Sequence, residues 1–254
     1  MKRNNTVNMM EHKQHIAFHE AGHAAGIHLN NKLKGLPPVF FKIVFKDISD
    51  LIEIEGMDYQ AVQDECIARV EGGRLIEFIP NSFHSDSVLE KLSEDNDKKL
   101  QLIGNYKSAF EADIINLLIG PLAEAKYVAD IDGELFNHKL ITLEALKNYG
   151  GSSDIALANE YLQSLSPDKH EQDGKLAELF SIAYNFIDNA ENWSAITHLA
   201  EYILGSCKHI IYCEEVITIL DKSVAHFKNR NAGSPLKINA GGIFDNVQRP
   251  MSHY

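Results

Sequence analysis

The sequence predicts a mainly α-helical fold with one small β-sheet, an α+β arrangement, and two observations support this. Over most of the chain, apolar residues recur at three- and four-residue spacing, which is typical of helices with one buried face. Residues 39–45 (VFFKIVF) are instead rich in β-branched and aromatic side chains, as strands are. With 254 residues, 44% of them apolar, the chain is long enough to bury a substantial core.

Six helices are expected along the chain. The first covers about residues 14–30, where Ile16, Ala24 and Ile27 contribute to an apolar stripe. Residues 151–154 (GSSD) resemble a helix start. The other predicted helices span 107–130, 155–165, 175–189, 193–206 and 214–227.

A small sheet is predicted within about residues 39–80. The segments 51–54 and 74–79 are expected to pair with the strand at 39–45. That strand could form a sheet edge that holds an extended peptide by backbone pairing, or it could simply be buried in the core. Residues 85–99 are acidic and polar, which indicates either an exposed helix or a loop insertion.

We expect one domain over residues 1–227. Residues 167–174 form a polar break between predicted helices. Residues 228–254 are rich in Gly and Asn and lack apolar periodicity, so a mobile tail is expected there.

Composition narrows the class of protein. The formal charge of -12 and the absence of a basic cluster argue against a nucleic-acid partner. The three cysteines (Cys66, Cys207 and Cys213) are too few and too far apart for a disulfide framework or a cysteine-based zinc site. No apolar run follows the basic N-terminus or reaches the ~20 residues that cross a bilayer. A cytoplasmic location without an integral membrane segment is therefore expected.

The motif with the clearest chemistry is His19-Glu20-Ala21-Gly22-His23, a His-Glu-x-x-His pattern in the first predicted helix. A four-residue spacing places both imidazoles on one helix face, where they can bind one Zn²⁺. Glu20 follows the first histidine and is the candidate catalytic base for water activated by the metal. The alternative is a chance match on a helix whose small residues only permit close packing.

A third protein ligand must come from outside this helix. His15 and His23 are eight residues apart, or about 12 Å along a helix axis, so they cannot share one zinc ion. His12, His15 and His28 are accordingly interpreted as solvated or hydrogen-bonded side chains.

Residues 18–24 (FHEAGHA) resemble the active-site helix of the FtsH-type AAA metalloproteases. Further segments follow in that family's order. Residues 74–80 (RLIEFIP) look like its strand after the first hairpin, and 115–126 (INLLIGPLAEAK) resemble its helix with a glycine followed by an Ala-Glu pair. Residues 150–158 (GGSSDIALA) are similar to its threonine-glycine-alanine-x-asparagine-aspartate segment, and 177–220 to its closing helices.

The resemblance implies a zincin-like peptidase domain of the FtsH type, in which His19, His23 and Asp154 hold Zn²⁺ and Glu20 is the base. In the family, the aspartate at the position of Asp154 is the third zinc ligand. An acidic residue near a helix start can also be only a helix cap. Glu124 and Glu160 are competing third ligands, and Glu124 is also a candidate to orient a ligating histidine.

The implied function is that of a zinc metalloendopeptidase. The chain contains no G-x-x-x-x-G-K-[ST] sequence and no membrane-spanning segment, so we expect a peptidase domain without its own ATPase motor. Its expected substrates are unstructured polypeptides, and its expected partners are a second copy of the chain or a separate unfoldase. The alternatives are a catalytically inactive zinc-binding module that acts in assembly, and a metal-free helical protein. Residues 131–148 look like an insertion ahead of Asp154, and Pro121 departs from the family pattern.

Overall fold

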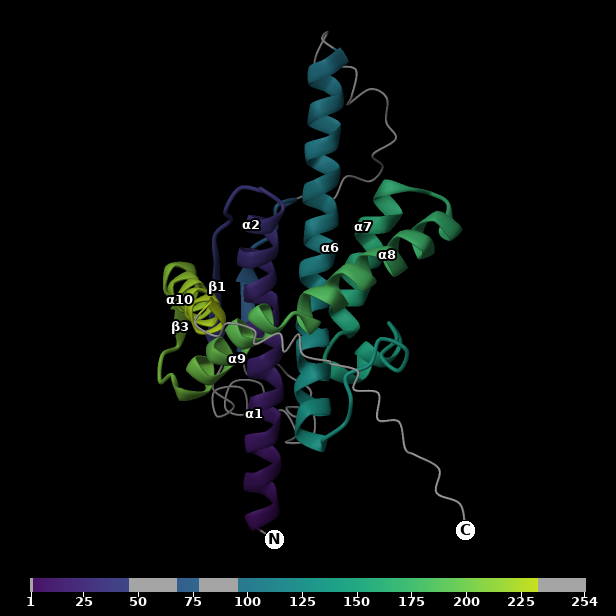
Figure 1. The fold of residues 1–254 in the computed structure, drawn as a ribbon. Coiled ribbons are helices and arrows are strands. Elements are labelled where there is room, and N and C mark those ends of the chain that lie inside the picture. The colour runs from purple at the N-terminus through teal and green to yellow at the C-terminus, as the bar shows by residue number, and fades with distance from the viewer. Residues whose placement is uncertain (1, 46–67, 78–95, 233–254) are drawn as a thin grey trace, which may run out of the picture.

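The computed structural model describes residues 2–45, 68–77 and 96–232. It confirms a mainly helical chain with a small antiparallel sheet (Figure 1). Its elements are α1 (Lys2–Ala25), the π-helix η1 (Gly26–Asn30), α2 (Asn31–Leu33), β1 (Phe41–Phe45), β2 (Ala68–Gly72), α6 (Asn96–Asp132), the 3₁₀ helix η2 (Ala145–Tyr149), α7 (Ser152–Leu165), α8 (Lys169–Asp188), α9 (Ala190–Gly205), β3 (Ile210–Tyr212) and α10 (Cys213–Ala232).

The helices α1 and α6 form the centre of the molecule, where they run antiparallel and in contact (Figure 1). Glycines on α1 allow the close approach. A Cβ atom at Gly22 would lie 2.7 Å from the Cβ of Ala123, and one at Gly26 would lie 3.0 Å from Cδ1 of Ile119. Side chains larger than hydrogen would therefore separate the two helices.

The remaining helices surround this pair. α7 and α8 pack on α6, α9 packs on α1, and α10 packs on α9. Asp168 caps α8 by accepting hydrogen bonds from the backbone N–H groups of His170 and Glu171. The predicted polar break at 167–174 is thus wrong for most of its length. The first three residues of α8 are polar and exposed, so this turn carries no apolar periodicity.

The sheet has the strand order β2-β1-β3, and both pairings are antiparallel. Ile43 of β1 faces Val70 on one side and Ile211 on the other. β1 is therefore the central strand, and the hypothesis that residues 39–45 provide a sheet edge is wrong. The sequence gives no sign of β3, because three residues are too short for a periodic pattern.

The predicted strand at 74–79 is also wrong for its described part, residues 74–77. Gly72 and Gly73 have positive φ angles of 85° and 81°, which end β2 and turn the chain away. The backbone N–H groups of Leu75 and Ile76 then donate to the buried carboxylate of Asp113 on α6 instead of to a strand. The predicted strand at 51–54 and residues 85–95 lie outside the described residues.

Several helix boundaries differ from the prediction. α1 begins at residue 2 instead of 14, and α6 at 96 instead of 107, because polar helix-forming residues carry no apolar stripe. α10 continues to Ala232, so residues 228–232 are helical, and the rest of the predicted tail lies outside the described ranges. Within residues 2–45, 68–77 and 96–232, each helix is too short or too polar to cross a bilayer.

Removal of the Asp113 carboxylate should destabilise the fold. In Asp113→Ala, the amides of Leu75 and Ile76 lose their acceptor, and the hydroxyl of Tyr161 keeps only the Ile76 carbonyl. Because an unsatisfied buried donor costs about 1–3 kcal/mol, we expect the free energy of unfolding to fall by roughly 2–4 kcal/mol in urea denaturation. The control is Asp130→Ala on the same helix, which removes an ion pair between the exposed Asp130 carboxylate and Lys126. It should change the free energy of unfolding by less than about 0.5 kcal/mol. Equal effects of the two substitutions would contradict the role of Asp113 as the buried acceptor for the backbone at Leu75 and Ile76.

Candidate metal centre

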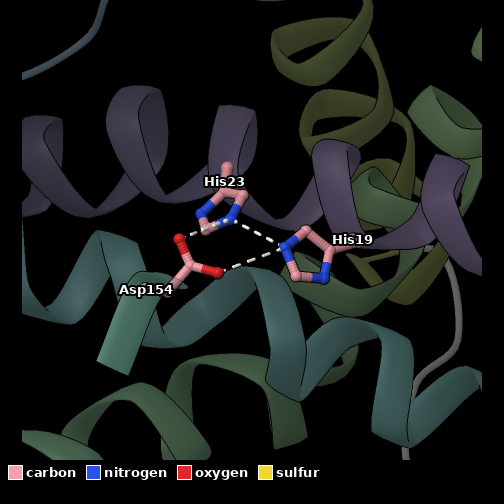
Figure 2. A group of neighbouring side chains, drawn as sticks. All are labelled: His19, His23 and Asp154. Atoms are coloured by element: carbon pink, nitrogen blue, oxygen red, sulfur yellow. Dashed lines mark hydrogen bonds and ion pairs between the residues drawn. The ribbon is translucent and has the colours of Figure 1, made fainter. Parts of the chain in front are cut away.

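Three side chains from two distant parts of the chain converge between α1 and the first turn of α7 (Figure 2). Nε2 of His19 lies 3.0 Å from Nε2 of His23. The carboxylate of Asp154 faces both rings, with Oδ2 at 3.5 Å from Nε2 of His19 and Oδ1 at 3.5 Å from Nε2 of His23. In the described part of the chain, this is the one group of three or more His, Cys, Asp or Glu side chains with the spacing of metal ligands.

The dimensions of this cluster suit a tetrahedral metal ion. Zinc binds nitrogen and oxygen ligands at about 2.0–2.2 Å, so two ligand atoms on a tetrahedral zinc ion lie about 3.3 Å apart. The two Nε2 atoms are 3.0 Å apart and each lies 3.5 Å from a different oxygen of Asp154, which is close to that spacing. Two imidazoles and one carboxylate are also a donor set that zinc accepts.

Hydrogen bonds at the far side of each ring fix the orientation of the imidazoles. Nδ1 of His23 donates to the backbone carbonyl of Asn116 at 2.9 Å. Nδ1 of His19 lies 3.1 Å from the carboxylate of Glu124 and 3.2 Å from the carbonyl oxygen of Tyr149. Carbonyl and carboxylate oxygens only accept hydrogen bonds, so both Nδ1 atoms carry the proton.

This tautomer has a consequence for the centre of the cluster. In two neutral rings protonated at Nδ1, both Nε2 atoms present lone pairs to each other and to the Asp154 carboxylate. Three electron-rich atoms at this separation repel one another unless positive charge lies between them. A proton on Nε2 of His19, whose pKa is raised, or a metal cation provides that charge. The hydrogen bonds to Nδ1 are the kind that orient histidine ligands in metal sites.

The charges in the site are strongly coupled. Burial disfavours the imidazolium form of His19, yet hydrogen bonding to Asp154 and Glu124 places its pKa well above the ordinary value. Burial opposes charge on Asp154 as well, but the neighbouring histidines hold the pKa of this carboxyl well below its usual range. The carboxylate is thus ionised, and the site attracts positive charge.

Glu20 lies beside the cluster on α1 and is buried, with 3% of its surface exposed. One carboxylate oxygen accepts a hydrogen bond from the backbone N–H of Val70 on β2. Burial raises the pKa of Glu20, while the charges of His19 and His23 act in the opposite direction. A carboxyl group with a raised pKa beside a metal site has the chemistry of a proton acceptor and donor.

The cluster is partly accessible to solvent. The side chains of His23 and Asp154 are 12% and 14% exposed, so solvent reaches the group. Catalytic zinc sites typically have three protein ligands and an open fourth position, whereas structural sites have four protein ligands. The described chain brings three such donors together.

The other candidate ligands do not join the cluster. Glu124 contacts the Nδ1 side of His19, opposite to the metal-facing nitrogen, which agrees with an orienting role. Glu160 is exposed on α7 and is absent from the group. Asp154 is not the cap of its helix, because Gly151 occupies the N-cap position. His28 bonds Asp221 on α10.

Sequence reasoning missed the backbone atoms that complete the site. The carbonyl groups of Asn116 and Tyr149 and the N–H of Val70 have no signature, because every residue has a backbone. Gly150 is a further part of the site that the sequence analysis missed. Its φ is 69°, and a Cβ atom there would lie 3.1 Å from the His19 ring. A Gly-Gly pair just before a predicted metal ligand indicates close packing of this kind.

No protein-family model, curated protein or solved structure gives a match to this chain. The assignment of the site therefore depends on its geometry and on the resemblance of its motifs.

Gly120→Ala tests whether the packing of α6 positions His23. A Cβ atom at residue 120 would overlap the imidazole ring of His23, so the ring must move and lose its place beside His19. We expect zinc affinity, measured by competition with a chromophoric chelator, to fall by at least tenfold.

Gly104→Ala is the matched control, because residue 104 lies on the same helix with no neighbouring atom within 4 Å of an added Cβ. It should leave zinc affinity unchanged and stabilise the helix by about 0.5–1 kcal/mol. Unchanged zinc affinity in Gly120→Ala would contradict the packing of His23 against α6.

Proposed function

We propose that this protein is a zinc-dependent metalloendopeptidase with a zincin-like site. The observation that carries the proposal is the partly exposed cluster of three zinc-type donors, with a buried carboxyl group supplied by the residue next to the first donor. His19, His23 and Asp154 would hold the metal ion. The resemblance to the FtsH-type metalloproteases supports the same reading.

The mechanism assigns a distinct task to each residue. A zinc ion in this site supplies Lewis-acid chemistry, which acidifies water and polarises a carbonyl group. Glu20 accepts the proton of the attacking water and passes it to the departing amine. Glu124 and the Asn116 carbonyl hold the two imidazoles in the tautomer that leaves Nε2 available to the metal.

The position of β2 supports an extended polypeptide as the substrate. β2 lies at an edge of the three-stranded sheet formed by the described residues, and the Val70 N–H points away from β1 toward Glu20. With the Val70 N–H released from Glu20, a peptide added along this edge would pair by backbone hydrogen bonds and pass close to the metal site. We therefore propose β2, instead of residues 39–45, as the edge strand that holds an extended peptide.

An extended conformation is accessible only to unstructured or unfolded segments. The sequence contains no phosphate-binding loop, so this chain has no motif with which to unfold a substrate by ATP hydrolysis. Disordered proteins are therefore the proposed substrates, and a homo-oligomer or a separate unfoldase remains the predicted partner.

A catalytically inactive zinc-binding module is the second candidate. The burial of Glu20 and its hydrogen bond to Val70 favour this function, because they tie the proposed base to the fold. The two candidates share the metal site and differ in whether peptide bonds are cleaved.

Glu20→Gln separates the two functions. The amide keeps the shape of the side chain but cannot accept a proton, so the rate of cleavage of a disordered protein should fall at least 10²-fold. Zinc content should remain unchanged because Glu20 is not among the three ligands.

Glu160→Gln is the control for this experiment, since it makes the same chemical change at an exposed position of α7. It should retain the wild-type rate. No cleavage by the zinc-loaded wild type would favour the inactive module, and equal rates for wild type and Glu20→Gln would exclude Glu20 as the base.

A further inference from the structure

Glu124 lies between two histidines of α1. Its Oε2 atom is 3.1 Å from Nδ1 of His19, and its Oε1 atom is 3.5 Å from Nδ1 of His15. The two histidines are four residues apart on one helix, so they share a face and are separated by one turn. Each oxygen of the carboxylate therefore faces a different imidazole.

The ring of His15 is held by a second contact with α6. It lies edge-on to the ring of Tyr127, with the ring centroids 6.0 Å apart and the planes at 82°. Tyr127 in turn stacks on Phe18, at 3.9 Å between centroids. Glu124 and Tyr127 are three residues apart on α6, so two adjacent positions of one helix hold the His15 side chain.

The two contacts restrict the Glu124 carboxylate. A carboxylate with a histidine facing each of its oxygens has less freedom to rotate away from His19 than one held at a single oxygen.

His15 itself does not belong to the metal cluster. It is eight residues from His23, and its Nδ1 faces Glu124 on the side of His19 opposite to Nε2. Its side chain is 33% exposed, whereas that of Glu124 is 10% exposed. Its contribution to the metal site must therefore pass through the Glu124 carboxylate.

We propose that His15 is a positioning residue that acts through Glu124: by holding Oε1, it keeps Oε2 directed at the Nδ1–H of His19 and so strengthens zinc binding. The inference rests on the proposed zinc site. Partners that directly orient a histidine ligand contribute about 10–100-fold to metal affinity. Because His15 acts one contact further from the ion, we expect a loss of roughly three- to tenfold in its absence.

The test uses the full chain and measures its dissociation constant for Zn²⁺ by competition with a chromophoric chelator. His15→Ala should weaken zinc binding by roughly three- to tenfold, and His15→Gln, whose amide can still donate to Glu124, should restore part of that loss. His28→Ala is the matched control: it removes a histidine–carboxylate pair with Asp221, away from the metal site, and should not change the constant.

A double-mutant cycle with Glu124→Ala separates a route through Glu124 from a general effect on the helix. If His15 acts through the carboxylate, His15→Ala should have no further effect on zinc affinity in the Glu124→Ala background. Additive effects of the two substitutions would overturn the inference, and so would an unchanged dissociation constant in His15→Ala. If the wild-type protein does not bind zinc, the proposed function fails together with the inference. If the wild type binds zinc and His15→Ala binds it equally well, only the inference about His15 fails.

Discussion

At Gly22 the two central helices approach so closely that a single added methyl group would touch both the Cβ of Ala123 and the carbonyl oxygen of Ile119. The metal centre depends on this contact. It brings the His23 ring over Gly120 and places the Nδ1 atoms of both histidines against acceptors on or near α6. The same helix therefore provides the space for the rings and the hydrogen bonds that orient them.

Buried amides hold the two helices in register about two turns beyond His23. Asn30 donates to the side chain of Asn116, which donates in turn to Asn31. These three residues are almost fully buried, and burying polar groups is costly unless they are paired in a fixed geometry. The π-helix η1 gives Asn30 and Asn31 their positions facing α6, and wide helical turns of this kind are frequent at functional sites. The network thus restricts sliding of α1 along α6, which would separate His23 from the Asn116 carbonyl.

The sequence predicted those parts of the structure that follow from local patterns. The helical spacing of His19 and His23 predicted that both rings share a face, and the resemblance proposed Asp154, which the fold brings to the same point. The end of β2 was not predictable in this way, because Leu75 and Ile76 are paired by Asp113, a residue about 40 positions away in the chain. The central place of β1 likewise depends on β3, a strand of three residues from the far end of the fold. Such long-range pairings leave no periodic signal near the residues concerned.

The central claim is that His19, His23 and Asp154 form a zinc site. Elemental analysis of the purified full-length protein, beside Asp154→Ala, tests it most directly. We predict one zinc ion per chain in the wild type and loss of that ion in Asp154→Ala, with helical content by circular dichroism unchanged. Absence of zinc from a zinc-equilibrated wild type, or one zinc ion retained by Asp154→Ala, would contradict the claim.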